Sequence, residues 1–175
     1  MAEKRKNWNG LISGFSASDL VFLDESGCNT DMTRRYAYSF GGSRAVDSTP
    51  LSKPKNTTIL SSIQLNGTLH YTTFSGGTTV ERFKRYLEND LLPHLNGNSI
   101  LVMDNMKSHH AKAVKELLDS SGVRYIYLPP YSPDLNPIEK LWSKVKALLR
   151  KFKARTLDAL PNAIQNAFHS VTVSD

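Results

Sequence analysis

Three carboxylates stand next to apolar segments that lie far apart along the chain. Asp24 follows the apolar run at residues 20–23, and Asp104 follows a second run at residues 100–103. Glu139 stands at the start of a long amphipathic pattern. If these segments are neighbours in the fold, the carboxylates converge, and two charges ~4 Å apart repel by roughly 1 to 4 kcal/mol between water and an effective dielectric constant of 20. A divalent cation relieves that repulsion, so the pattern indicates an oxygen-lined site for Mg²⁺ or Mn²⁺.

Such a site has a defined chemistry. Two ions ~3.5–4 Å apart hold a scissile phosphate, one activating a water and the other stabilising the leaving oxygen. Asn105 and His109 follow Asp104 closely enough to support the site, although spacing alone does not define their roles. The other interpretation is that the acids are ordinary turn and helix-start residues, where carboxylates are common and interact favourably with the helix dipole. The residues by themselves leave both interpretations open.

Strand patterns dominate the first half of the chain. Residues 20–23 form a buried strand that is expected to break at residues 25–27. Two β-branched, apolar runs at residues 57–65 and 68–74 flank an Asn-Gly pair, which predicts a hairpin with a type I′ turn. Between them, residues 35–40 alternate aromatic and other side chains before the Gly41-Gly42 turn, and residues 43–55 have the composition of a loop.

Helical spacing then alternates with short apolar runs. The helices are expected at residues 80–91, 111–122, 138–152 and 156–168, and residues 98–104 and 123–128 are the intervening strands. Antiparallel hairpin strands followed by alternating helices and strands predict a single domain with a mixed α/β sheet.

Composition narrows the class of partner. The 175-residue chain has a net charge of +6 and a pI of about 9.4, which favours polyanions such as DNA or RNA. A single cysteine, Cys28, excludes a disulfide framework and a cysteine-based zinc site. No apolar run approaches the ~20 residues of a membrane span. We therefore expect a protein of the cytoplasm with no membrane partner, and a basic, flexible lead-in at residues 1–16.

One longer motif is specific to a family. Asp104-Asn105, His109, the run at residues 128–139 (Leu-Pro-Pro-Tyr-Ser-Pro-Asp-Leu-Asn-Pro-Ile-Glu) and Trp142 resemble the catalytic domain of the Tc/mariner superfamily of DDE transposases, with the bacterial insertion sequences as the nearest branch. The interval between Asp104 and Glu139 matches that superfamily, and residues 22–27 are similar to its first acidic motif.

This resemblance implies a ribonuclease H-like fold in which Asp24, Asp104 and Glu139 are the catalytic, metal-binding triad for two Mg²⁺ or Mn²⁺ ions. Such enzymes cut DNA at transposon ends and then join the freed 3′-hydroxyl to target DNA. On this basis residues 17–155 are the catalytic domain and residues 156–175 a last helix with a truncated tail. The N-terminal helix-turn-helix domain of relatives is expected to be absent, so the implied partners are DNA, a second copy in the DNA complex and a separately encoded helix-turn-helix protein. In a bacterium the chain would associate with the nucleoid.

Several further residues are predicted to contact DNA. Lys140, Lys144 and Lys151 fall roughly on one side of the helix that begins near Glu139, where the alternative is an ordinary solvated face. Tyr131 either stacks on a base or packs against the proline-rich turn. His109 is expected near the active site, His110 at the surface and Trp142 in the core.

Two other functions remain. The chain is alternatively an inactive or truncated remnant that binds DNA or a transposase partner, or a ribonuclease H-like nuclease that does not join strands. Neither the terminal-repeat sequence, the target site nor the oligomeric state follows from the residues.

Overall fold

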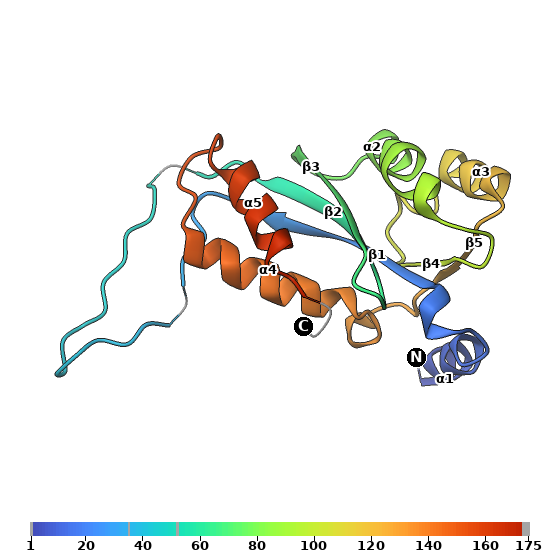
Figure 1. Ribbon diagram of the computed structural model, residues 1–175, viewed down its shortest axis with the longest axis horizontal. Coiled ribbons are helices and arrows are strands. Elements are labelled where there is room, and N and C mark those ends of the chain that lie inside the picture. The colour runs from blue at the N-terminus through green and yellow to red at the C-terminus, as the bar shows by residue number, and fades with distance from the viewer. Residues whose placement is uncertain (1, 35, 52, 173–175) are drawn as a thin grey trace.

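The protein is a mixed β-sheet between two layers of helices (Figure 1). The computed structural model describes residues 2–34, 36–51 and 53–172, and within them the sheet has five strands in the order β3-β2-β1-β4-β5. The strands are β1 Leu20–Cys28, β2 Thr57–Gln64, β3 Leu69–Ser75, β4 Ile100–Met103 and β5 Arg124–Tyr127. The helices are α1 Ala2–Ile12, α2 Val80–Tyr86, α3 Lys112–Ser121, α4 Ile138–Phe152 and α5 Leu160–His169, and α2 continues through a π-helical turn at Leu87–Leu91 into a 3₁₀ turn at Leu92–His94.

The sheet changes character at β1. Strands β1, β2 and β3 are antiparallel, whereas β4 and β5 run parallel to β1. This is the predicted succession of an antiparallel hairpin followed by alternating helices and strands, and the mixed α/β class is confirmed.

Strand β1 is longer than predicted, and Asp24 lies inside it rather than at its end. The strand pairs with β2 from Val21↔Gln64 to Cys28↔Thr57, but its ladder with β4 stops at Phe22↔Val102. Gly27 stays in the strand because Thr58 of β2 is its partner, so the neighbouring strand overrides its turn-forming preference. The predicted break at residues 25–27 was wrong for that reason.

The β2–β3 hairpin is confirmed, but its turn is of another type. The backbone N–H of Gly67 donates to the Gln64 carbonyl at 3.0 Å, and Gly67 has φ of 83°. Among the described non-glycine residues only Tyr131 and Lys153 have positive φ, so Asn66 does not adopt the type I′ geometry. Its side chain instead accepts a hydrogen bond from the backbone N–H of Thr68 at 2.9 Å. A turn followed by a left-handed glycine is the usual form of a three-residue hairpin loop.

Each face of the sheet packs on its own set of helices (Figure 1). Val21 and Leu23 of β1 point to the layer of α2 and α3, whereas Phe22 points to the opposite layer, because side chains alternate along a strand. The second layer contains α4 and α5 over the antiparallel half and α1 over the parallel half. No helix in the described part of the chain has the length and apolarity to cross a bilayer.

The expected flexible lead-in differs from the structure, where α1 spans most of it. Trp8 is only 9% exposed and packs with Leu20, Ile100 and Leu128, and Arg5 forms an ion pair with Asp134. The apolar contacts come from Trp8, Ile12 and Phe15 alone, too few to produce a clear helical period in the sequence.

The chain between β1 and β2 projects from the body as a long loop (Figure 1). The described residues of the aromatic stretch at 36–40 form no strand, since alternation needs a neighbouring strand to become a ladder. Arg155 holds the base of the loop by donating to the carbonyls of Met32 and Ser48, each at 3.0 Å. Arg35 and Ser52 lie outside the described residues, and the predicted turn at Gly41-Gly42 is present with both φ angles positive.

We expect Trp8→Ala to destabilise the protein by about 3 kcal/mol, because truncating a buried tryptophan removes apolar contacts and leaves a cavity. The midpoint of urea unfolding measures the loss, with Lys6→Ala, an exposed change on the same helix, as the control. Equal midpoints for the two variants would show that α1 is not packed on the sheet.

Candidate active site

Strand register brings the first two acids together. The parallel ladder pairs Phe22 with Val102, so two residues further along both strands Asp24 and Asp104 lie at the same level. The next ladder pairs Met103 with Tyr127, which brings Leu128 to the same edge, and its backbone N–H donates to the Met103 carbonyl at 2.8 Å. Since β4 ends at Met103 while β1 continues, a gap opens beside Asp24.

The gap is a cavity of about 440 Å³ that contains all three predicted acids. Glu139 reaches it from the first turn of α4, with Pro137 immediately before the helix. The structure thus brings together Asp24, Asp104 and Glu139 from three separate elements. The remaining lining residues are Asn105, Met106, Leu128, Pro129, Pro130, Tyr131, Ser132, Pro133 and Asn136.

Asp24 is held by two donors. The backbone N–H of Glu25 donates to Oδ1 at 2.8 Å, and the indole N–H of Trp142 donates to Oδ2 at 3.2 Å. Burial raises the pKa of Asp24 to about 7, against the lowering effect of the Glu25 hydrogen bond and with a further rise from the charge of Asp104. Trp142 is in the core, as predicted, and it also orients a site carboxylate, because it follows Glu139 by one turn of α4.

Asp104 is held from the opposite face of the sheet. Its Oδ1 accepts a hydrogen bond from the backbone N–H of Met106 at 2.9 Å and lies 2.8 Å from Nδ1 of His109. Burial alone would raise the pKa of Asp104, but these donors hold it below its usual value. His109 is fully buried, and its Nε2 lies 3.1 Å from Oε1 of Glu25. Burial alone would lower the pKa of His109, but the hydrogen bonds and charges of Asp104 and Glu25 raise it to about 9.

Glu25 belongs to the site although the sequence patterns did not predict it. Ligand atoms of Glu25, Asp104 and His109 all lie within 4.8 Å of one another, the spacing of a metal site. However, both ring nitrogens of His109 already face carboxylate oxygens at hydrogen-bonding distance, so this cluster is a hydrogen-bonded group that backs the cavity. The available signal was the position of Glu25 directly after Asp24, which places the two acids on opposite faces of β1.

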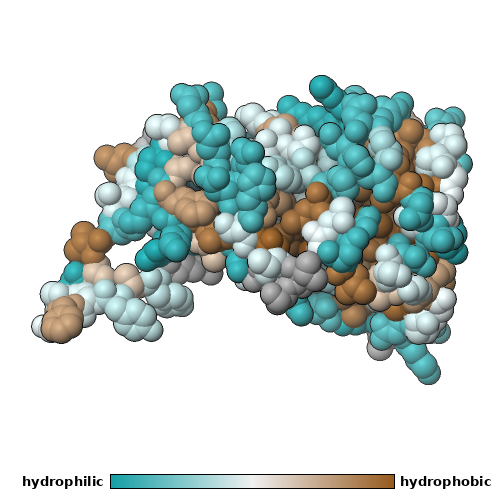
Figure 2. All heavy atoms as spheres, viewed as in Figure 1, coloured by the Kyte–Doolittle hydropathy of each residue, from teal (hydrophilic) through white to brown (hydrophobic). Residues whose placement is uncertain are grey.

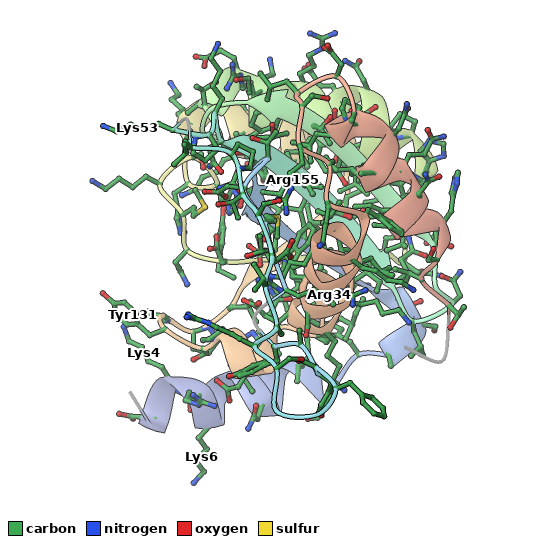
Figure 3. All side chains as sticks on the ribbon, turned by 90° about the vertical axis from the view of Figure 1, so that its left-hand side faces the viewer. Lys4, Lys6, Arg34, Lys53, Tyr131 and Arg155 are labelled. Carbon is green, nitrogen blue, oxygen red and sulfur yellow. The ribbon has the colours of Figure 1, made fainter. Side chains whose placement is uncertain are left out.

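Asn105 and Tyr131 lie on the cavity wall. The side-chain amide of Asn105 donates to the Leu128 carbonyl and its Oδ1 lies 3.2 Å from Nε2 of His110. His110 is half-buried and stacks on Tyr127 at a centroid distance of 4.1 Å, so the predicted surface position was only partly correct. Tyr131 is 88% exposed, has φ of 54° and extends outwards on the same side as Lys4 (Figure 3). Packing against the proline-rich turn, one of its two predicted roles, does not cover its ring.

The predicted DNA-binding lysines lie on another side of α4 from Glu139. At about 100° per residue, Lys140, Lys144 and Lys151 are displaced from Glu139 by about 100° to 140°. Lys140 lines a separate apolar cavity with Leu65 and Val171. Lys146 and Arg150 instead fall within about 20° of Glu139 around the helix. The contact of the three lysines with DNA stays a prediction.

Comparison with known proteins agrees with this arrangement. The family model of the DDE superfamily endonucleases matches residues 19–161. The Tc1 transposase of Caenorhabditis elegans is 30% identical over 83 residues, which are 47% of this chain and 30% of that protein. The Tcb2 transposase of Caenorhabditis briggsae is 28% identical over 96 residues, 53% of this chain and 35% of that protein. The chain thus spans about a third of the curated relatives it matches.

Solved structures show the same fold. The Mos1 transposase in its paired-end complex with the left transposon end superposes with a TM-score of 0.79 at 20% identity, over 97% of this chain and 54% of that chain. The catalytic domain of Mos1 mariner transposase gives 0.72 at 18% identity, over 98% and 81%. The ribonuclease H-like fold is therefore confirmed. Because the family model covers most of the chain, this chain belongs to the DDE superfamily endonucleases, and within its matched segments it is similar to the Tc1 and Tcb2 transposases.

Proposed function

We propose that this chain is the catalytic domain of a transposase, which cleaves DNA at transposon ends and joins the freed 3′-hydroxyl to target DNA. The observation that carries the proposal is the convergence of Asp24, Asp104 and Glu139 in one cavity at the carboxyl end of β4. The Mos1 structures that share the fold include a paired-end complex with the left transposon end and a strand transfer complex.

The residues in the cavity fit divalent cations. Their donors are hard oxygens, which suit Mg²⁺ and Mn²⁺. The raised pKa of Asp24 reflects burial beside the negative charge of Asp104, an arrangement that a cation stabilises. Mos1 structures with Mg and with Mn are among the similar proteins. Two bound ions would activate the attacking hydroxyl and stabilise the leaving oxygen at the scissile phosphate.

The protein's own contribution is positioning. Trp142 holds Asp24 from the α4 face, while His109 holds Asp104 from the α2 and α3 face, so each carboxylate has one oxygen fixed by a ring nitrogen. Asn105 ties the segment after β4 to the segment after β5 through the Leu128 carbonyl. Fixed ligands lower the reorganisation needed when substrate binds.

Two features of the cavity rim would contact DNA. Tyr131 presents an exposed ring for stacking on a base, and it is held in a left-handed backbone conformation that non-glycine residues rarely adopt. Lys146 and Arg150 share the side of α4 that carries Glu139, so they would bind phosphates near the scissile bond.

We also propose that two copies pair in the DNA complex through the projecting loop. Tyr36, Tyr38 and Phe40 are almost fully exposed there, as are Val46 and Leu51. Figure 2 shows hydrophobic residues interspersed with more polar ones along this loop, away from the body of the molecule. Exposed apolar side chains gathered on one segment indicate a protein contact. A separately encoded helix-turn-helix protein that recognises the transposon ends remains a prediction.

The central experiment is Asp104→Asn. We expect Mn²⁺ affinity, measured by calorimetry, to fall by more than about 100-fold, since even outer partners of a metal contribute 10–100-fold. Mg²⁺-dependent nicking of duplex DNA and joining of its 3′-ends to a second duplex should be lost together. Asp158→Asn, an exposed change of the same chemistry, is the control. A wild-type chain that binds DNA without nicking it would favour the inactive remnant, and nicking without joining would favour a nuclease.

Contact between α4 and DNA can be tested with two double variants, each of which removes two positive charges from a different side of the helix. We expect the double change Lys146→Ala and Arg150→Ala to weaken DNA binding and to lower the slope of log affinity against log salt by about 2, roughly one for each lost phosphate contact. Lys140→Ala with Lys151→Ala tests the lysines indicated by the sequence. A larger change in slope for this second pair would place the DNA on the other side of the helix.

If two copies pair through the loop, changes in the loop should weaken self-association on DNA. We expect Tyr38→Ser with Phe40→Ser to weaken self-association on DNA by at least tenfold, because exposed aromatic side chains contribute strongly to interfaces. Sedimentation of the chain with a labelled duplex measures the dimer, and Thr49→Ala in the same loop is the control. Unchanged dimerisation would exclude the loop as the contact between copies.

A further inference from the structure

Glu25 is a buried carboxylate with an incomplete set of partners. Its side chain is 8% exposed, and its Oε1 lies 3.1 Å from Nε2 of His109. No hydrogen bond from the described residues reaches Oε2, which is buried. Glu25 faces away from the cavity that contains its neighbour Asp24, because adjacent residues of β1 point to opposite faces of the sheet. A buried charge with so few partners is unfavourable for stability, so its presence calls for another reason.

That reason lies in the ring it contacts. The imidazole ring of His109 has two nitrogen atoms, and each of them faces a carboxylate oxygen. Nδ1 faces Asp104 and Nε2 faces Glu25. The ring stacks on Phe83 at a centroid distance of 4.1 Å, which fixes its plane. Stacking does not prevent a 180° flip of the ring about its Cβ–Cγ bond, which keeps the plane but exchanges the nitrogen and carbon positions. The contact with Glu25 opposes that flip, because a flipped ring would present Cε1 in place of Nε2 to Oε1.

The orientation of the ring determines the orientation of Asp104. Oδ1 of Asp104 is occupied by Nδ1 of His109 and by the backbone N–H of Met106. No hydrogen bond from the described residues involves Oδ2, and Asp104 lines the cavity. Fixing Oδ1 therefore leaves Oδ2 as the oxygen that can serve a cation.

We propose that Glu25 is a positioning residue of this active site, which acts through His109 to set the carboxylate of Asp104. The inference rests on the proposed function, since it assigns Glu25 to the metal-binding step of that reaction. It goes beyond the three acids of the cavity by adding a fourth acid, on the opposite face of β1, that touches neither cation nor DNA. For this role Glu25 must provide an oxygen that accepts a hydrogen bond from Nε2 of His109, and the charge of the carboxylate is not required.

Two conservative variants distinguish the length of the Glu25 side chain from its charge. Glu25→Gln keeps an oxygen at the same distance but removes the charge, whereas Glu25→Asp keeps the charge but is one methylene too short to reach Nε2. We expect Glu25→Asp to weaken Mn²⁺ binding and slow Mg²⁺-dependent nicking at saturating metal by about tenfold each, within the range found for partners of metal ligands. Glu25→Gln should remain within about threefold of the wild type. The ring ¹⁵N resonances of His109 in the metal-free protein should shift in Glu25→Asp and stay near their wild-type positions in Glu25→Gln.

The opposite pattern would overturn the proposal. If Glu25→Asp binds Mn²⁺ like the wild type, or if Glu25→Gln is as impaired as Glu25→Asp, the contact with Nε2 does not position Asp104. If both variants lose only stability, with Mn²⁺ affinity and the His109 resonances unchanged, Glu25 is a structural residue. A wild-type chain that takes up no Mn²⁺ would instead refute the proposed function itself, which distinguishes the two failures.

Discussion

The repulsion between neighbouring carboxylates is the constraint on which the rest of this structure depends. Parallel pairing of β1 and β4 puts Asp24 and Asp104 at the same level of the sheet, where burial and mutual charge raise the pKa of Asp24. The fold keeps both acids in place with donors that approach from different sides: Trp142 reaches Asp24 from one helical layer and His109 reaches Asp104 from the other. The indole of Trp142 is neutral, and His109 is shared between Asp104 and Glu25, so the three carboxylates of the cavity keep an excess of negative charge that a cation would neutralise.

The difference in length between β1 and β4 is what makes room for that chemistry. If β4 continued beside β1, the gap next to Asp24 would be filled by another strand and its backbone would be paired. Instead, the chain leaves the sheet after Met103, and the segment after β5 turns away through Pro129 and Pro130 into α4. Strand β2 is the one strand that pairs with β1 beyond Phe22 in the described part of the chain. The cavity therefore depends on an antiparallel neighbour that is longer than the parallel one.

Much of this organisation could be predicted from local patterns. The apolar runs before Asp24 and Asp104, the Asn-Gly hairpin and the stripe of α4 all produce elements where the sequence indicated them. The length of β1 and the formation of a packed helix at α1 could not be predicted, because both depend on contacts with segments distant in sequence. The end of β1 pairs with Thr57 and Thr58, and Trp8 of α1 packs with Ile100 and Leu128. Glu25 and Trp142 were missed as site residues for a related reason. Each looks like an ordinary neighbour of a predicted acid. Only the tertiary structure shows that Trp142 donates to Asp24 and that Glu25 contacts His109, which in turn contacts Asp104.

Helix α4 contributes both to the hydrophobic core and to the cavity that contains the three acids. Its buried stripe includes Ile138, Leu141, Val145 and Leu149, which pack against the sheet and α5. Glu139 and Trp142 are one turn apart on the same helix, so the helix delivers one carboxylate and fixes a second. A shift of α4 by even a fraction of a turn would move both groups at once, and a helix packed on both the sheet and α5 resists such a shift because interiors are close-packed. The apolar stripe thus has two roles that cannot be separated: it holds the domain together, and it sets the geometry of the acids.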